Sequence, residues 1–338
     1  MNYIGSKASL LDFLNRSIAS VVDPSCQTFC DLFAGTGAVG RFFKTQGYTV
    51  IANDLQYYSY VLNKHYIETI DSPTFSSLTV ECPNIFQFLS DLEGKEGFIY
   101  RHYAKGGDAK RQYFSDENAK KCDAVRQQIE TWKTQELLTE SEYFYLLASL
   151  LESIDKVANT ASVYGAFLKT LKKSAQVPLI LKPAQVIPGG AGHHRVFNVD
   201  ANTLIEQITP DILYLDPPYN HRQYAANYHV LETIARYDSP VLYGETGLRE
   251  CPEQRSDYCL KSKVKQAFTE LILKAKAKYI FLSYNNEGLL SLDEIKEIMS
   301  LRGGYRIFTQ PYARYKADSN RDYSANSTLE YLHAVKVS

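Results

Sequence analysis

The sequence predicts a doubly wound α/β fold that carries a second, mostly helical domain as an insertion. Short apolar runs with β-strand character alternate with helical patterns over residues 26–70 and again over residues 195–335. The intervening residues 85–185 have mostly helical patterns and are too numerous for a connection between a strand and a helix. We therefore predict a sheet domain made of residues 1–80 and 190–338, and an inserted domain made of residues 81–189.

Length and composition exclude several classes of protein. The chain has 338 residues, of which 45% are hydrophobic and 22% are charged, so it can form one large core or two ordinary domains, and a disordered chain or a disulfide miniprotein is excluded. Six cysteines occur without a Cys-x-x-Cys pair, which argues against a structural zinc site, and we interpret them as buried thiols. No apolar run approaches the roughly 18 residues of a membrane-spanning helix, and the N-terminus lacks the layout of a secretory signal, so we expect a cytoplasmic protein.

Seven apolar runs are the candidate strands of the sheet. In chain order they span residues 28–32, 50–52, 195–199, 212–215, 279–283, 305–309 and 330–335. The chain has no internal repeat and no low-complexity tract, so these runs and the local charge define its organisation.

The first candidate strand leads into a glycine-rich segment that opens a helical pattern. Gly35, Gly37 and Gly40 satisfy the pattern G-x-G-x-x-G, and Asp54 follows at the end of the next candidate strand. Such glycines let a ligand approach the backbone at a helix N-terminus, and a carboxylate like that of Asp54 can accept hydrogen bonds from ribose hydroxyls. The pattern predicts a nucleoside-bearing cofactor, with a plain tight turn as the structural alternative.

Asp31 bears on the choice of cofactor. At the tip of the first strand, its negative charge would lie near the pyrophosphate of NAD, although NAD stays possible on these residues alone. A cofactor that carries an ammonium group suits Asp31 better.

The charge of the insertion changes partway along the chain. The formal net charge is -1, so the overall charge indicates no nucleic-acid partner. Residues 156–199, however, contain no Asp or Glu, and a mixture of aromatic and small hydroxyl residues around Tyr164 lies within them. The cations of this acid-free segment are Lys156, Lys169, Lys172, Lys173, Lys182 and Arg195, to which His193 and His194 can add charge. We interpret the segment as a nucleic-acid contact, with a solvated face of a structural helix as the alternative.

The fourth candidate strand ends in Asp216-Pro217-Pro218-Tyr219, the signature of amino methyltransferases that act on nucleic-acid bases. Two consecutive prolines fix two φ angles and remove two backbone donors, so the turn is rigid and offers only acceptors. Since an exocyclic amino group supplies only donors, Asp216 and the Pro217 carbonyl can hold the two amino hydrogens of adenine and aim its nitrogen at the methyl group of S-adenosylmethionine. Tyr219 supplies a face on which a flipped base can stack. A structural Pro-Pro turn is the alternative.

The order of motifs resembles the Dam-like α group of adenine-N6 DNA methyltransferases. That order is Asn2-Tyr3-Ile4-Gly5-Ser6-Lys7, the glycine loop after Asp31, Asn53-Asp54, an insertion, and Asp216-Pro217-Pro218-Tyr219. Residues 216–238 (DPPYNHRQYAANYHVLETIARYD) and 155–175 (DKVANTASVYGAFLKTLKKSA) are similar to the adenine methylases of type IIS restriction systems. The resemblance implies a Rossmann-like S-adenosylmethionine-dependent methyltransferase sheet, with the insertion as the DNA target-recognition domain.

The resemblance also implies how the cofactor S-adenosylmethionine would be bound. Asp31 would take the methionine ammonium, Asp54 the ribose and Asp200 the cofactor adenine, although a short Asp at a strand end is often a helix cap. Tyr3 would pack on the cofactor, and Lys7 would reach toward the cofactor or DNA. The implied cofactor-binding set is Tyr3, Lys7, Asp31, Phe33, Gly35, Gly37, Asp54, Asp200 and Asp216.

The same resemblance implies the DNA contacts. Residues 283–286 (SYNN) would lie beside the catalytic turn, with a plain Asn-rich loop as the alternative. The segment that carries Arg314 and Lys316 lies between the last two candidate strands, where this family has a hairpin loop near the target base. The expected DNA-binding set is Lys7, Tyr164, Lys169, Lys172, Lys173, Arg222, Arg314 and Lys316.

We therefore expect a monomeric or weakly associating adenine-N6 methyltransferase that acts on duplex DNA without a metal, as the modification enzyme of a restriction-modification system. A cognate endonuclease would share its DNA site without necessarily binding it. Two other functions stay open: an amino methyltransferase for cytosine, RNA or another amide-bearing substrate, and a catalytically silent DNA-binding module. The silent module is disfavoured because a DNA binder has no need of all five of the residues Asp31, Gly35, Gly37, Asp54 and Asp216.

Overall fold

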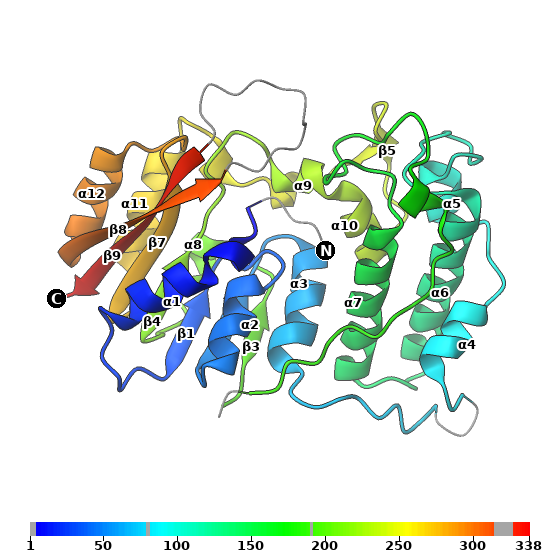
Figure 1. Cartoon of the computed structure of the whole chain (residues 1–338), viewed down its shortest axis with the longest axis horizontal. Helices are drawn as coiled ribbons and strands as arrows, with labels where there is room; N and C mark the ends of the chain where they lie inside the picture. The colour runs from blue at the N-terminus through cyan, green and yellow to red at the C-terminus, as the bar shows by residue number, and fades with distance from the viewer. Residues whose placement is uncertain (1–4, 79–81, 190–191, 314–326) are drawn as a thin grey trace. The chain divides into compact units, whose positions relative to one another are not determined.

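A computed structural model describes residues 5–78, 82–189, 192–313 and 327–338 of the chain. The chain divides into two compact units. The sheet unit comprises Gly5–Asn63, Pro188–Tyr224 and Gln254–Ser338, and the helical unit comprises Lys64–Ile187 and Ala225–Glu253 (Figure 1). This division differs from the predicted boundaries, because residues 64–78 and 225–253 belong to the helical unit and residues 188–189 belong to the sheet unit.

Seven strands form the central sheet of the sheet unit, in the order β3-β2-β1-β4-β7-β9-β8. The first five strands of this order are parallel, whereas β9 runs antiparallel to both of its neighbours. Their bounds are β1 Thr28–Asp31, β2 Thr49–Asn53, β3 Arg195–Phe197, β4 Ile212–Leu215, β7 Tyr279–Asn285, β8 Gly303–Ala313 and β9 Ser327–Val337. Each strand overlaps one of the seven predicted runs, which confirms the predicted α/β sheet.

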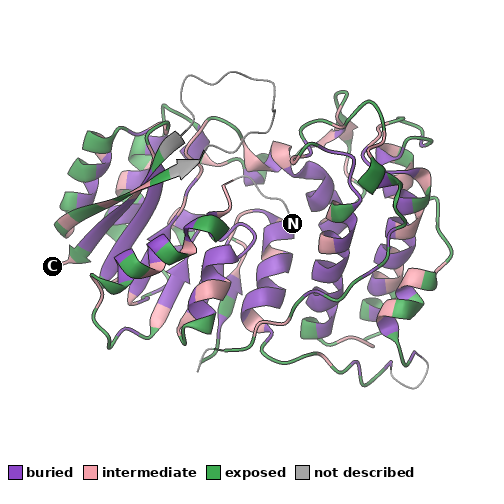
Figure 2. Cartoon of the chain, viewed as in Figure 1, coloured by how far each residue is buried: buried purple, intermediate pink, exposed green. Residues whose placement is uncertain are grey.

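Helices cover both faces of this sheet (Figure 1), so its inner strands are buried (Figure 2). Successive side chains of a strand point to opposite faces. Phe29 of β1 stacks on Phe43 at 4.0 Å between ring centroids, within the core under α1 and α2. Its neighbour Cys30 lies in the opposite core, with Leu271 of α11. The helices of this unit are η1 Lys7–Leu10, α1 Leu11–Ala19, α2 Ala38–Thr45, α3 Tyr57–Asn63, α8 Ala201–Leu204, η5 Asp257–Cys259, α11 Val264–Lys274 and α12 Leu292–Ser300.

The helical unit is built around α7, which is buried almost continuously from Glu142 to Leu151. A helix that is buried on most of its faces lies at the centre of its domain. The Thr139 and Glu142 side chains form a capping box that fixes where α7 begins. The elements of this unit include α4 Ile85–Asp91, α5 Phe98–Tyr103, α6 Asp116–Thr134, α7 Glu140–Lys156, α10 His229–Arg236 and the hairpin of β5 Leu242–Tyr243 with β6 Leu248–Arg249.

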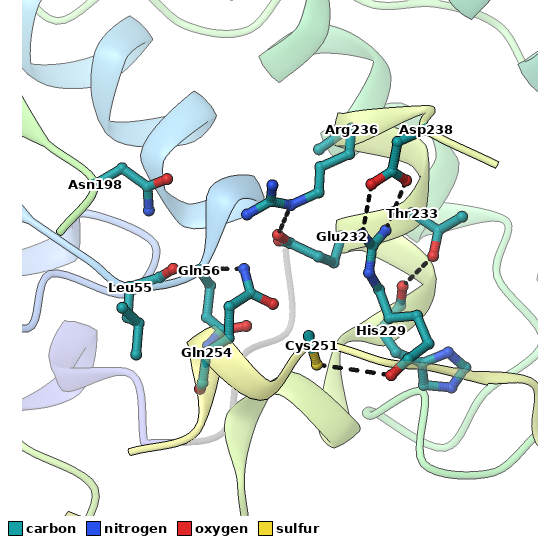
Figure 3. A network of polar contacts seen from close by, with 12 residues as sticks. Leu55, Gln56, Asn198, His229, Glu232, Thr233, Arg236, Asp238, Cys251 and Gln254 are labelled. Atoms are coloured by element: carbon teal, nitrogen blue, oxygen red, sulfur yellow. Dashed lines mark hydrogen bonds and ion pairs between the residues drawn. The ribbon is translucent and has the colours of Figure 1, made fainter. Parts of the chain in front are cut away.

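Polar contacts explain why α10 belongs to the helical unit, although it follows the Asp216 motif closely in sequence. Arg126 of α6 is buried, and its guanidinium donates to the carbonyl oxygens of Ile234 (3.0 Å) and Ala235 (3.2 Å) near the end of α10. After α10, Arg249 of β6 makes two hydrogen bonds, of 3.0 and 2.6 Å, with the Asp238 carboxylate (Figure 3). These bonds satisfy the last carbonyl groups of the helix and fix the segment that follows it.

Within the described part of the chain, none of the helices is both long enough and apolar enough to cross a membrane. All six cysteines are free, and five of them are buried, as the sequence predicted.

Candidate active site

Parallel pairing brings the ends of β1, β2 and β4 to one edge of the sheet. Asp31 is paired with Ala52 of β2 and with Tyr214 of β4, so the glycine loop and the turn at Asp216 both begin at this edge. Ligands of open α/β sheets bind outside the carboxyl ends of the strands. The two sequence motifs therefore belong to one candidate site.

The glycine loop has a backbone that only glycine adopts easily. Gly35 and Gly37 have φ angles of 52° and 76°, in the left-handed region. A Cβ atom on Gly37 would lie 2.7 Å from Oδ1 of Asn63, so the loop also has no space for a side chain there. The Asn63 amide in turn donates to the carbonyl of Gly35 at 3.0 Å. The loop is thus a tight turn from which α2 begins, and Gly35 and Gly37 place no side chain over its backbone.

Asp31 has one carboxylate oxygen without a partner. Its Oδ2 accepts a hydrogen bond from the amide of Gly40 at 3.0 Å, whereas its buried Oδ1 has no donor among the described residues. Burial and the nearby carboxylate of Asp216 raise the pKa of Asp31 to about 8, with a further contribution from Asp54. An unpaired buried carboxylate oxygen suits a cationic ligand group.

Asp54 is tied to the loop on both of its oxygens. Oδ2 accepts from the amide of Gly35 and Oδ1 from the amide of Gln56, both at 2.8 Å. Nearby, the Asn53 amide donates to the carbonyls of Leu32 and Val199, which joins the ends of β1, β2 and β3. The carboxylate of Asp54 therefore orders the loop, and its lone pairs can accept further donors.

The other residues expected at the cofactor lie around this loop. Asp200 is exposed and caps α8 by accepting from the amide of Thr203 at 3.0 Å, which matches the structural alternative stated for it. Phe33 is half-buried and meets the edge of Tyr258 at 5.1 Å between ring centroids. Gln56 donates to the carbonyl of Gln254 at 3.4 Å (Figure 3). This bond connects the segment after Asp54 to Gln254, the first residue of the segment 254–338 of the sheet unit.

At the end of β4, Asp216 is held by an ion-pair cluster. The ammonium of Lys7 lies 3.2 Å from Oδ1 of Asp216 and 2.6 Å from Oε1 of Glu330 in β9. Burial and Glu330 raise the pKa of Asp216, and Lys7 lowers it, with a net value of about 6. Burial favours the neutral amine of Lys7, but the two carboxylates outweigh it and raise the pKa of Lys7 well above its usual value. At neutral pH the ammonium of Lys7 therefore faces an ionised Asp216 carboxylate.

Tyr219 is fixed next to the turn. Its carbonyl accepts from the amide of Leu289 at 3.0 Å, and its ring meets the ring of Tyr284 edge-on at 6.2 Å. Tyr284 is itself buried and accepts at its hydroxyl from the amide of Leu290 at 3.2 Å. Residues 283–286 thus lie beside the turn, as the sequence predicted.

Comparison with known proteins decides which chemistry this geometry serves. Residues 3–298 match the family of D12 class N6 adenine-specific DNA methyltransferases. The chain belongs to this family. It is 54% identical to the type II methyltransferase M.NlaIII of Neisseria lactamica, with 99% of each chain covered. It is 41% identical both to the type II methyltransferase M.FokI of Planomicrobium okeanokoites and to the modification methylase StsI of Streptococcus sanguinis, of which it spans 52% and 55%.

The protein is accordingly an adenine-specific DNA methyltransferase, and the sequence-based assignment of family and activity is confirmed. A methyltransferase of this family implies S-adenosylmethionine as the methyl donor. The site fits that group, because the unpaired oxygen of Asp31 suits its ammonium and the bare backbone at Gly35 and Gly37 allows its close approach. Among the described residues, no group of His, Cys, Asp and Glu could hold a metal ion.

The residues expected to contact DNA have different environments. Tyr164 is completely buried and donates from its hydroxyl to Asp155 at 2.9 Å, so its side chain has no surface for DNA and that prediction is wrong for this structure. The ammonium of Lys172 donates to the carbonyl of Thr160 at 2.8 Å, so it is engaged within the protein. The exposed members of the set are Lys169, Lys173 and Arg222, whereas Arg314 and Lys316 lie outside the described residues, as does Tyr3 of the expected cofactor set.

Two further expectations concern Lys7 and His194. Lys7 is buried and paired with Asp216 and Glu330, and its predicted contact with the cofactor or DNA stays a prediction. His194 was expected to add charge, but its Nδ1 accepts from the amide of Val50 at 3.0 Å, and burial lowers its pKa, so it is neutral. The acid-free segment therefore has fewer available cations than its sequence suggests.

Sequence reasoning missed Glu330 and Asn63. Glu330 is the acidic residue of an otherwise apolar or aromatic run, Leu329 to Val335, and a carboxylate within a predicted strand is a usable signal of a buried ion pair. Asn63 carries no comparable signal, because an Asn at the end of a helical pattern is ordinary.

Proposed function

We propose that this methyltransferase is the modification enzyme of a restriction-modification system and that it methylates adenine N6 at a specific site in duplex DNA. The observation that supports the proposal most directly is the partly exposed Asp216 carboxylate, held by Lys7 at the edge where the glycine loop begins. Relatives with the names type II methyltransferase and modification methylase support the restriction-modification context.

The cofactor residues follow from the chemistry of the loop. We assign the ammonium of S-adenosylmethionine to Asp31, whose Oδ1 has no donor among the described residues, and the ribose to Asp54. Asp200 is assigned to the cofactor adenine in addition to its role as a helix cap. Phe33 and the backbone at Gly35 and Gly37 would line the remaining surface. When bound, S-adenosylmethionine would supply the electrophilic methyl group, and the electron pair of the broken S–CH3 bond would stay on sulfur in the leaving group, S-adenosylhomocysteine.

The turn at Asp216 binds and orients the adenine amino group. Asp216 Oδ2 and the carbonyl of Pro217 accept its two hydrogens, while the ring of Tyr219, held by Tyr284, stacks on the base. The amino nitrogen acts as the nucleophile, and it needs no prior deprotonation, because its proton becomes acidic only as the new C–N bond forms. Asp216 or solvent then accepts that proton, and correct placement of the two reactants provides most of the rate enhancement.

We further propose that the enzyme acts as a monomer and that a cognate endonuclease recognises the same DNA site without forming a stable complex with it. The family relationship identifies DNA as the substrate. Because the formal net charge is -1, DNA binding needs local cations, and we assign this role to exposed Lys169 and Lys173.

Replacing Asp216 with Asn tests the central assignment. We expect the rate of methyl transfer at saturating DNA and cofactor to fall by at least about 100-fold, because the amide loses the charge and one acceptor used on the amino group. The assay supplies labelled S-adenosylmethionine separately with duplex DNA, RNA and protein, so that it also tests the alternative substrates. Circular dichroism and cofactor affinity should stay near those of the parent. A variant with near-parental turnover would remove Asp216 from the reaction.

The methylated base and its sequence context are open to direct measurement. Methylation-sensitive sequencing of DNA from a host that expresses the protein should show modified adenine in a single short motif. Modified cytosine, or adenine methylation without a common motif, would contradict the proposal.

A further inference from the structure

The Lys7 cluster contains more buried charge than the binding of a base requires. Lys7 and Glu330 are 4% and 5% exposed, and Glu330 does not belong to either sequence motif. The two residues come from opposite ends of the chain, on η1 and on β9. Removing two charges from water is costly unless they are paired with good geometry, so a purely structural cluster would gain little over apolar residues.

The distances show which carboxylate interacts more closely with the Lys7 ammonium. Its Nζ is 2.6 Å from Glu330 but 3.2 Å from Asp216, so Glu330 is the closer of the two partners. Asp216 keeps a side chain that is 17% exposed, against 6% for that of Glu330. Lys7 thus lies between the Glu330 carboxylate, which is buried, and the Asp216 carboxylate, which is partly exposed and can accept a ligand.

The unequal distances matter for Asp216, because its carboxylate must accept a hydrogen of the adenine amino group. A lysine paired with Asp216 alone would neutralise the carboxylate and compete with the substrate for its lone pairs. A second carboxylate close to the ammonium offsets that charge, while Lys7 still holds Asp216 Oδ1 in place. Oδ2 of Asp216 then stays a strong acceptor in a fixed position.

We propose that Glu330 is a positioning residue of methyl transfer, which takes up most of the Lys7 charge and so leaves the Asp216 carboxylate oriented and available to the adenine amino group. This inference rests on the proposed role of Asp216. The groups that face Asp216 are Lys7 from η1, Glu330 from β9 and Asp31 from β1, together with Tyr214 of its own strand.

The test compares Glu330→Gln, Glu330→Asp and Lys7→Met with the parent, as full-length enzymes on duplex DNA. In Glu330→Gln, Lys7 acts on Asp216 alone, so we expect kcat to fall by about 10- to 100-fold while the KM for S-adenosylmethionine stays within about twofold. Glu330→Asp keeps the negative charge and should recover most of kcat. Glu206→Gln, in the exposed pair with Lys274, is the matched control and should behave like the parent.

The pH profile of kcat/KM for DNA separates positioning from a structural role. Glu330 raises and Lys7 lowers the pKa of Asp216, so the acidic limb of the profile should move to lower pH in Glu330→Gln and to higher pH in Lys7→Met. A merely structural role predicts loss of stability with an acidic limb that does not move. Opposite shifts in the two variants support the proposal.

Three outcomes would overturn it: a kcat for Glu330→Gln within about twofold of the parent, an acidic limb that stays in place, or limbs that shift in the same direction. If Glu330→Gln does not fold, the double variant Lys7→Met/Glu330→Gln removes both buried charges, and its acidic limb should lie between those of the parent and Lys7→Met. A limb that coincides with that of Lys7→Met would then overturn the proposal. Asp216→Asn, assayed in parallel, distinguishes failure of the Glu330 proposal from failure of the proposed function, because an active Asp216→Asn would refute the proposed function itself.

Discussion

At the scale of single residues, Asp31 makes cofactor binding depend on pH. Its pKa of about 8, raised by burial and by the charges of Asp216 and Asp54, means that the free enzyme holds a proton there at neutral pH. An ammonium group binds the carboxylate and not the acid, so binding must release that proton. Affinity for S-adenosylmethionine should therefore rise about tenfold per pH unit between pH 6 and 7.5, below the pKa of Asp31.

Isothermal calorimetry checks this prediction directly. In two buffers with different ionisation enthalpies, the apparent binding enthalpy at pH 7 should differ in proportion to the proton released. Asp31→Asn cannot release it and should bind weakly with an affinity that is nearly independent of pH. A parent affinity that is flat from pH 6 to 7.5 would show that Asp31 is already ionised in the free enzyme.

Asp54 is expected to act mainly on binding. Asp54→Ala removes the acceptor for the amides of Gly35 and Gln56 as well as the proposed ribose contact, whereas Asp54→Asn keeps one carbonyl oxygen. Loss of a charged hydrogen-bond partner costs about 1.5–3 kcal/mol, so the Kd for S-adenosylmethionine should increase roughly 10- to 150-fold in the alanine variant and less in the asparagine variant. The kcat at saturating cofactor should change far less, because a ribose contact is similar in the ground and transition states. Equal cofactor affinity of parent and Asp54→Ala would remove Asp54 from the site.

At the scale of secondary structure, Asp211 connects the starts of β1 and β4. Its Oδ2 accepts from the amides of Gln27 and Thr28, both at 2.9 Å, and from the Thr28 hydroxyl at 2.8 Å, while Lys278 lies 2.7 Å from Oδ1. Burial alone would raise the pKa of Asp211, but Lys278 and these donors hold it well below its usual range. The carboxylate therefore aligns the two strands whose opposite ends carry Asp31 and Asp216.

Asp211→Ala should destabilise the sheet unit by about 1–3 kcal/mol at pH 7, because it leaves the amides of Gln27 and Thr28 without their acceptor and Lys278 without its ion pair. A group whose pKa is lowered by folding adds stability above its unfolded value, about 3.9 for Asp, and loses that contribution as the pH falls through the folded value. The difference between parent and variant should therefore shrink below about pH 4. Urea unfolding at several pH values measures it, with Glu206→Ala in an exposed ion pair as the control. Equal transitions at pH 7 would show that the strand ends are aligned without Asp211.

The elements that sequence could predict are those with local signals. The run 212–215 is apolar at each of its positions and is followed by two prolines, so β4 Ile212–Leu215 has the predicted bounds. The boundary of the helical unit was not predictable in the same way, because α10 joins it through Arg126, more than 100 residues earlier in the chain. Glu330 meets Lys7 across 323 residues of sequence. Tyr164 was misassigned because an aromatic residue among lysines has the same pattern whether it faces DNA or a core.

At the scale of the whole molecule, DNA binding must come from local cations, since Lys and Arg together number 37 against 38 for Asp and Glu. The acid-free segment of residues 156–199 contains five lysines and one arginine and no Asp or Glu. Within it, Lys156, Lys169, Lys173 and Lys182 are exposed, whereas the ammonium of Lys172 donates to Thr160. Of the three lysines expected to contact DNA, Lys169 and Lys173 are therefore the better candidates for phosphate contacts.

Replacing Lys169 and Lys173 together with Ala should weaken DNA binding in a salt-dependent way. Each lysine that neutralises one phosphate contributes about 0.9 to the slope of log affinity against log salt concentration, so the double variant should flatten that slope by nearly 2. The preferred DNA sequence and the affinity for S-adenosylmethionine should not change, because phosphate contacts carry no sequence information.

The control variant Lys95→Ala/Lys105→Ala removes the same charge from exposed positions of the helical unit outside the acid-free segment, and it should keep the parental slope. DNA affinity measured at several salt concentrations for parent, variant and control decides the matter. If the two double variants have equal slopes, Lys169 and Lys173 are solvated side chains, and the phosphate contacts belong to other cations, with exposed Arg222 as the next to test.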